Sequence, residues 1–438
     1  MSPFAYLLST LLGIVVTVSL VLVQMAANRY LPQIIDLFFN WKVYLVPFCT
    51  FIFSIVYINV SHQISFIHLP NLDIFLFFLS IGLLVPYFYL LFDFLKPANI
   101  IKRISNDAIK FLNQGRRKKM EEMIANIGRM GKSSIQYMIS EIPIVAINSE
   151  RNIMCRHLLL KNELSEEWFN VDEEDFPGTP PQAIAEIKKN KTWLEMKIFH
   201  DFVTMFTFIL NSSYKLRDVI TSILINVRIL GEKAQEVDDR PTLNLSLKFF
   251  NTFCRLALNS RDRAIIYNIF YQYRLLAETL FKNYEGTSLR IASFIKYYGV
   301  TAEDAGVPYI LETGIYDLMM LNCVTSEKKT GMRNALLDEF LSLGILYKKR
   351  KNERILRDFR KRCLMLGGFY LLKGDTVFAL RITEVLKEMP MEVIKEIERE
   401  LLEVKDQDFW EITDRIINFD YVDAEHKAKI REFVDKLK

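Results

Sequence analysis

The chain has 438 residues, of which 51% are hydrophobic and 25% are charged, and its formal net charge is +4. This length suits two or three domains, and the composition is too polar for a polytopic transporter. The five cysteines are odd in number and scattered, without pairing or zinc-site spacing, which argues against a disulfide framework and indicates a reducing compartment.

Three long stretches near the N-terminus contain no charged side chain: 1–28, 43–72 and 74–92. Each holds about the 20 apolar residues that a helix needs to cross a hydrocarbon core of ~30 Å. We therefore predict membrane-spanning helices at about 4–27, 43–66 and 74–95, in a transmembrane domain that covers 1–97. No basic residue precedes the first apolar run, so we expect an uncleaved span and not a signal peptide.

The first predicted span carries a polar stripe, because helical spacing places several small or polar residues on one face. These residues are Ser9, Thr10, Gly13, Thr17 and Gln24. The stripe could pack against the second and third spans through small side chains and hydroxyls. Alternatively, it could line a water-filled pore at the centre of a homo-oligomer. No ionisable residue lies at mid-membrane depth in any of the three spans, which argues against a proton relay.

A short interfacial helix is predicted at 31–41, between the first two spans. Its Pro32 suits a first helical turn. Its apolar side chains share one face: Ile34, Ile35, Leu37, Phe38 and Trp41. An amphipathic helix of this kind is typical of the headgroup layer. Pro47 and Pro86 fall inside the second and third spans and predict kinks there.

Basic residues predict the orientation of the spans. The loop after the first span carries Arg29 and Lys42, the loop after the second carries neither lysine nor arginine, and a dense basic block follows the third. The block consists of Lys96, Lys102, Arg103, Lys110, Arg116, Arg117, Lys118 and Lys119. Because basic loops stay in the cytoplasm, we expect the N-terminus outside and the C-terminal domain inside.

The same basic block bears on nucleic-acid binding. Only Asp107 opposes it, so the remainder of the chain is slightly acidic. Next to a bilayer, each lysine or arginine would gain about 1 kcal/mol from anionic headgroups. A nucleic-acid-binding protein would carry its positive charge on a folded face away from the membrane. We therefore expect headgroup contact and no nucleic-acid partner.

The run from Leu8 to Pro32, LSTLLGIVVTVSLVLVQMAANRYLP, resembles the hallmark of a family of predicted bacterial membrane proteins. That family is a domain of unknown function, numbered twenty-two fifty-four. A second similarity covers Arg240 to Leu276 and departs from the family at Arg263, where the family has proline. The resemblance implies a bacterial inner-membrane location and brings no established activity.

Beyond the spans, the pattern predicts one helix after another. Apolar residues recur at helical spacing in 218–236 and 243–258, and only 143–147 suggests a strand. Segment 163–182 holds seven carboxylates and then two proline-containing pairs, which predicts a mobile surface loop. We expect a juxtamembrane helical stalk at 98–162, a helical domain at 183–330 and a helix-hairpin region at 331–438. The predicted fold class is all-α, with three spans and an antiparallel helical array.

One segment near the C-terminus is similar to a tetratricopeptide repeat, in which small residues let two helices touch, glycine forms the turn and proline follows. The residues that carry this similarity are Leu366, Gly367, Tyr370, Gly374, Ala379 and Pro390. A partial copy, Leu343-Gly344-x-x-Tyr347, lies 23 residues earlier instead of the ~34 of that repeat. A groove on such an array would bind a protein segment.

Catalytic and metal-binding signals are weak. Gly128 to Ser133 resembles a phosphate loop, but Asn126 stands where the first glycine is required. Cys155 and His157 lack a second pair at zinc-site spacing, and His200-Asp201 suits a core or capping pair. We predict no catalytic residue, no metal and no cofactor.

Three functions remain open. The first is a non-enzymatic inner-membrane protein whose cytoplasmic helical domain binds a partner or senses a signal. The second is a homo-oligomeric ion channel lined by the polar stripe of the first span. The third is a membrane-bound enzyme with an unrecognised site.

Overall fold

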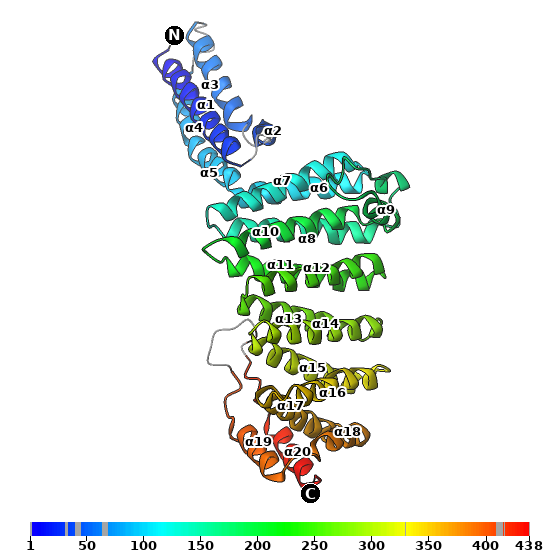
Figure 1. Ribbon diagram of the computed structural model, residues 1–438. Helices are drawn as coiled ribbons and strands as arrows, with labels where there is room; N and C mark the ends of the chain where they lie inside the picture. Colours follow the sequence, from blue (N-terminus) through cyan, green and yellow to red (C-terminus); the bar gives the residue numbers. More distant parts are fainter. Residues whose placement is uncertain are drawn as a thin grey trace. The chain divides into compact units, whose positions relative to one another are not determined.

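The computed structural model describes residues 2–30, 34–39, 45–63, 69–328, 330–408, 415 and 417–437 (Figure 1). Throughout these residues the regular structure is helical and no strand occurs, so the predicted all-α fold is confirmed. The chain forms two compact units, Met1–Ile153 and Met154–Lys438. Their boundary falls within helix α8 (Glu141–Leu160), not at the predicted divisions near 97 and 162.

The first unit contains the apolar helices. These are α1 (Pro3–Arg29), α3 (Leu45–Gln63), and α4 (Pro70–Gly82) with its continuation α5 (Leu84–Leu95). In the described residues they form three helical stretches that are long and apolar enough to cross a membrane. The third stretch is interrupted at Leu83, because Pro86 has no N–H to donate to the carbonyl of Gly82. The remaining predicted span residues, 43, 44 and 64–66, lie outside the described residues.

Small polar contacts connect these helices. The hydroxyls of Ser19 in α1 and Tyr87 in α5 lie 2.6 Å apart. Ser80 of α4 donates to Ser54 of α3 at 3.0 Å. All three serines and the tyrosine are buried, so the contacts lie inside the bundle. Short hydrogen bonds between small residues are typical of helices that associate without a hydrophobic driving force.

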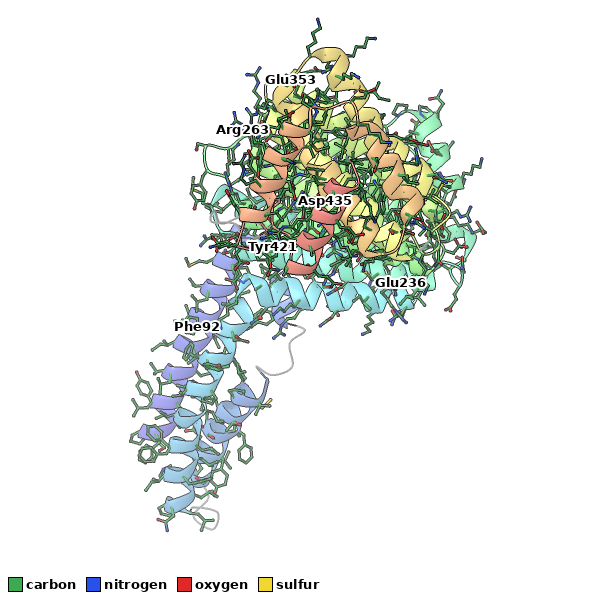
Figure 2. The ribbon with its side chains drawn as sticks, turned by 90° about the horizontal axis from the view of Figure 1, so that it is seen from below. Phe92, Glu236, Arg263, Glu353, Tyr421 and Asp435 are labelled. Atoms are coloured by element: carbon green, nitrogen blue, oxygen red, sulfur yellow. The ribbon has the colours of Figure 1, made fainter. Side chains whose placement is uncertain are left out.

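Large apolar side chains point outward from every helix of the bundle (Figure 2). Met25 of α1, Phe53 of α3, Phe78 of α4 and Val85 and Phe92 of α5 are all exposed. Contiguous apolar surface of this extent is rare on soluble proteins.

Helix α2 (Ile34–Phe39) lies within the predicted interfacial helix, whose other residues fall outside the described part of the chain. Ile34 and Phe38 are buried, and the ring of Phe38 meets that of Phe94 in α5 edge-on, with centroids 5.9 Å apart. Ile35 is exposed. The predicted apolar face is therefore divided, and part of it packs on the bundle because aromatic contact is available there.

Helix α6 (Pro97–Asn113) follows α5 after one extended residue, Lys96, and pairs with α7 (Arg117–Gln136). Contacts across this junction are close: Lys96 Nζ lies 3.0 Å from the Asp93 carboxylate, and Asn99 donates to the Asp93 carbonyl at 2.8 Å. The guanidinium of Arg103 lies 4.7 Å from the centre of the Phe94 ring. The junction is a tight corner and not a linker.

The predicted strand at 143–147 is wrong, because these residues lie in the first turns of α8. Pro143 is tolerated there, since the first turn of a helix has no internal partner for its missing N–H. A run of five apolar residues does not by itself distinguish a strand from a buried helix.

The second unit is an array of antiparallel helices (Figure 1). Its elements are η2 (Glu166–Phe169), α9 (Pro181–Lys189), α10 (Trp193–Asn211), α11 (Arg217–Glu236), α12 (Arg240–Asn259), α13 (Arg263–Leu280), α14 (Glu285–Asp304), α15 (Pro308–Lys328), α16 (Arg333–Arg350), α17 (Glu353–Leu372), α18 (Thr376–Leu386), α19 (Met391–Glu403) and α20 (Ala424–Asp435). Odd-numbered helices α11 to α17 pack on one another in one row. Even-numbered helices α12 to α16 form the other row.

The array repeats with a regular step. Arg217, Arg240 and Arg263 begin three successive helices, 23 residues apart. Equivalent positions of consecutive hairpins touch, as between Asn268 and Thr221, 47 residues apart, and between Arg290 and Asn244, 46 residues apart. This period lies near the ~40–47 residues of known two-helix solenoid repeats.

The same step explains the two related motifs in the sequence. Gly344 and Gly367 lie in consecutive helices, α16 and α17, whose first residues are 20 apart, so their 23-residue spacing is about one helix step and not a shortened repeat. A Cβ at Gly344 would lie 2.3 Å from Phe359 Cε1, and one at Gly367 would lie 2.4 Å from Phe433 Cε1. Glycine is required where an aromatic ring of the neighbouring helix presses on the backbone.

The acidic segment 163–182 is only partly the solvated loop that the sequence predicts. Trp168 and Phe169 are buried, and Trp168 Nε1 donates to His157 Nε2 at 3.1 Å. Beside them, Lys161 Nζ lies 3.0 Å from Glu195 and 2.6 Å from Asp239. Six of the seven acidic residues are exposed and Asp175 is half-buried, whereas the two aromatic residues among them anchor the segment to the array.

We expect Gly367→Ala to lower the free energy of unfolding by about 1–3 kcal/mol, because the Phe433 ring must move from a packed site. Gly286→Ala is the matched control, since a Cβ there meets nothing within 4 Å and alanine is the better helix former by up to ~1 kcal/mol. Equilibrium denaturation of the full chain measures both. Equal effects of the two variants would contradict the packing role of Gly367.

A second prediction concerns Glu195. Burial alone would raise the pKa of Glu195, but Lys161 and His157 hold it at about 2. A carboxyl whose pKa is lowered on folding stabilises the protein above its ordinary pKa and loses that contribution as pH falls. Glu195→Gln should therefore cost about 3 kcal/mol at pH 7. The difference from wild type should shrink as pH drops from about 4.5 toward 2.

Urea unfolding followed by tryptophan fluorescence measures this difference at several pH values. Trp168 and Trp193 report on the cluster formed by His157, Lys161 and Glu195, because they lie beside it with ring centroids 5.7 Å apart. A cost that is independent of pH would show that the carboxylate charge is not what stabilises the cluster.

Candidate functional site

The polar stripe of α1 faces away from the other helices. Thr10, Gly13, Thr17 and Gln24 are exposed and Ser9 is half-buried. A Cβ at Gly13 would meet nothing within 4 Å. The predicted packing of this stripe on the second and third apolar helices is therefore not found. The opposite face, with Ala5, Leu8, Val15, Ser19 and Val23, makes those contacts because aliphatic side chains fill the interior better.

The hydroxyls of the stripe are satisfied within the helix itself. Thr10 donates to the carbonyl of Tyr6 at 3.1 Å, and Thr17 donates to that of Gly13 at 2.8 Å. Ser19, a polar residue of α1 that contacts another helix, is not among the residues predicted from the sequence, because it lies off the stripe.

The basic block lies on the junction of α5 and α6 and on α6 and α7. Lys102, Lys110, Arg116, Lys118 and Lys119 are exposed, as is Lys96, whereas Arg103 and Arg117 are half-buried. Arg116 and Lys119 both lie over the Phe111 ring, 5.2 and 5.6 Å from its centre. The opposite face of α6 is apolar and buried: Ile100, Ile101, Ile104, Ala108 and Leu112.

The residues of the repeat-like motif fall where a helical hairpin needs them. Leu366 and Tyr370 of α17 and Ala379 of α18 are buried, and Gly374 forms the turn with φ +75°. Pro390 precedes the first residue of α19. The Tyr370 hydroxyl donates to Asn322 Oδ1 of α15 at 3.4 Å, so the hairpin is bound to the preceding one.

A groove of about 780 Å³ lies between α16 and α18, with α17 as its floor. Its apolar lining consists of Leu341, Gly344, Ile345, Leu356, Phe359, Val385 and Met389. Ile345 is 73% exposed, although it is a large apolar side chain. Gly344 lets the wall α16 approach the floor closely, because a Cβ there would lie 2.3 Å from Phe359 Cε1 of α17. The groove suits an apolar side of a peptide or helix.

Charged residues of both signs surround this groove. Arg381 pairs with Asp338 across it, and Lys348 pairs with Glu388. Arg360 is held by Glu353 at 3.3 Å. An apolar floor inside a mixed polar rim is the usual composition of a protein-binding surface.

A buried charged cluster lies on the other row of helices. Arg415 makes two contacts with the Asp317 carboxylate of α15, at 2.6 and 2.9 Å, and Arg274 of α13 lies 3.2 Å from the same carboxylate. Burial raises the pKa of Glu278, which Arg274 also contacts at 2.9 Å. The sequence carries no signal for this cluster, because Arg415 and Asp317 are 98 residues apart.

The residues that gave weak catalytic or metal-binding signals in the sequence do not come together as a site in the described part of the chain. Residues 128–133 lie inside α7, so their backbone N–H groups are engaged within a helix instead of cradling a phosphate. Cys155 and His157 share α8, and His157 contacts Glu195 and Trp168. Burial raises the pKa of Cys254, Cys323 and Cys363, which makes these thiols unreactive. Within the described residues, no group of three His, Cys, Asp or Glu side chains could hold a metal ion.

No protein-family model and no curated protein sequence matches this chain. Among solved structures, it is similar to a "Circular tandem repeat protein with novel repeat topology and enhanced subunit contact surfaces". The two share 13% sequence identity with a TM-score of 0.41, over 90% of this chain and 96% of that chain.

Proposed function

We propose that this protein is a non-enzymatic bacterial inner-membrane protein whose cytoplasmic helical array binds a segment of a partner protein. The observation that carries the proposal is the groove between α16 and α18, which leaves Ile345 open to solvent above an apolar floor. The resemblance of Leu8 to Pro32 to the bacterial membrane-protein family supports the location.

The membrane part of the proposal rests on the first unit. Its three apolar helices expose side chains such as Phe78 and Val85, which lipid would solvate better than water. The exposed lysines and arginines beside α5 would meet anionic headgroups of the inner leaflet, which supports an N-terminus outside and an array inside.

The partner would insert an apolar face into the groove. The walls α16 and α18 lie on either side of α17, and the ion pairs of the rim leave no excess of one sign to select a strongly charged ligand. An amphipathic helix satisfies both features, with apolar residues on α17 and mixed charges toward the rim.

We expect Ile345→Glu to weaken partner binding by about tenfold or more, because a carboxylate would have to be buried against Phe359 and Leu356. Val377→Glu is the matched control, since Val377 is 67% exposed on α18 but does not line the groove. Photo-crosslinking in cells with the full chain, followed by mass spectrometry, measures both. Unchanged crosslinked partners in the Ile345 variant would refute the groove as the binding site.

A homo-oligomeric channel is the second candidate, and the outward stripe of α1 favours it. Gln24 and Gly13 face away from the other described helices of the bundle, where another copy or a column of water could meet them. Such a pore would need several copies arranged with this face inward.

For the channel, we expect Thr17→Leu to reduce ion flux through the protein in liposomes by several-fold, because leucine removes a hydroxyl and narrows the lining. Thr50→Leu on α3 is the control, since the Thr50 hydroxyl makes the same kind of bond, to Val46 O at 2.9 Å, on another helix. Sealed liposomes that conduct no ions with the wild-type protein would eliminate the channel.

A further inference from the structure

Arg415 and residues 417–420 lie along the odd-numbered row of helices as a bound ligand would. The Arg415 side chain is completely buried and makes its two contacts with Asp317. It also donates to the carbonyl of Tyr267 at 3.0 Å, and its guanidinium lies 4.3 Å from the centre of the Tyr267 ring and 5.1 Å from that of Tyr271. Planar two-point binding of this kind selects arginine over lysine.

The next contacts fall on α15 and α17. The Phe419 ring stacks on Tyr316, with centroids 4.1 Å apart and planes 12° apart. Arg362 of α17 donates to the carbonyl of Phe419 at 2.6 Å and lies 2.8 Å from the Asp420 carboxylate. Figure 2 labels Tyr421, the next residue of the chain. Arginine, aromatic ring and acid thus each occupy a separate place on three consecutive helices of one row.

The fit of this segment is incomplete. A cavity of about 230 Å³ remains beside it, lined by Tyr309, Glu312, Asp358 and Arg362 together with 417–420. Burial raises the pKa of Asp358 and Glu312, and Asp358 Oδ2 is buried without a hydrogen-bond partner. A ligand with a basic group at this place would make a contact that the chain's own segment does not.

Release of Arg415 would not leave a bare charge behind. Arg274 lies 3.2 Å from Asp317 and stays in place, because it belongs to α13. When the segment departs, Asp317 therefore remains paired with Arg274, and the tyrosines that contact Arg415 stay in place. In a purely structural ion pair, removal of one partner would leave the other charge buried and unpaired.

We propose that helices α13, α15 and α17 form a second binding surface, which residues 415–420 occupy as an internal ligand. The surface takes a protein segment with an arginine, an aromatic residue four positions later and an acid directly after it. A partner segment of this chemistry, with a further basic residue toward Asp358, competes with residues 415–420. This surface is separate from the α16–α18 groove and does not depend on it.

The test uses the full chain in lipid nanodiscs and a fluorescent peptide of the chain's own sequence, Asp-Arg-Ile-Ile-Asn-Phe-Asp-Tyr (414–421). In Arg415→Ala/Phe419→Ala the surface is vacant, so the peptide should bind about tenfold or more tighter than to wild type. Adding Asp317→Asn should abolish that gain, because the arginine loses its two-point partner. A peptide with alanine in place of its arginine is the ligand control.

Two outcomes would overturn the proposal. One is a folded double variant, judged by circular dichroism, that binds the peptide no better than wild type. The other is binding that persists after Asp317→Asn. If the double variant does not fold, Arg415→Lys replaces it, since lysine keeps the buried charge but not the two-point contact. It should raise peptide binding several-fold, and no change would equally refute the internal ligand.

Discussion

Close contact between successive helices is the constraint from which the second unit is built. A helix of the array can bury its apolar side only on its neighbours, so each 23-residue step must return the chain to the same distance from the preceding helix. Gly344 and Gly367 meet this demand, since a Cβ at either position would collide with an aromatic ring. The close approach of α16 to Phe359 in the α16–α18 groove follows from the same requirement.

Hydrogen bonds and ion pairs between side chains follow the repeat of helices. Pairs between residues 46 or 47 positions apart, such as Arg290 with Asn244 and Arg350 with Glu303, join one hairpin to the next near the surface. Buried pairs occur within the array, as between Arg274 and Asp317, and they also attach segments that are not part of the repeat: Lys161 with Glu195 beside the acidic segment, and Arg415 with Asp317. Since buried pairs contribute little net stability, their value here is the choice of one position for each segment.

Hydropathy and helical periodicity were enough to predict the all-α fold and the apolar helices, because both signals are local. The strand suggested at 143–147 is wrong, since five apolar residues in a row are also compatible with a helix, and α8 already begins at Glu141. The polar stripe of α1 was recognised, but its direction depended on which face packs better. The motif around Gly367 and its partial copy around Gly344 were seen in the sequence, whereas the period of 46 or 47 residues became visible only through contacts between hairpins. Arg415 and Asp317 had no sequence signal, because neither belongs to a motif.

The single residue between α5 and α6 has a mechanical consequence. Lys96 is bound to Asp93, Asn99 donates to the Asp93 carbonyl, and Arg103 covers Phe94, so no slack exists at the corner. A rotation of α5 about its own axis would move α6 with it. Any rotation of α5 would therefore be transmitted to the α6–α7 pair, because only Lys96 separates α5 from α6.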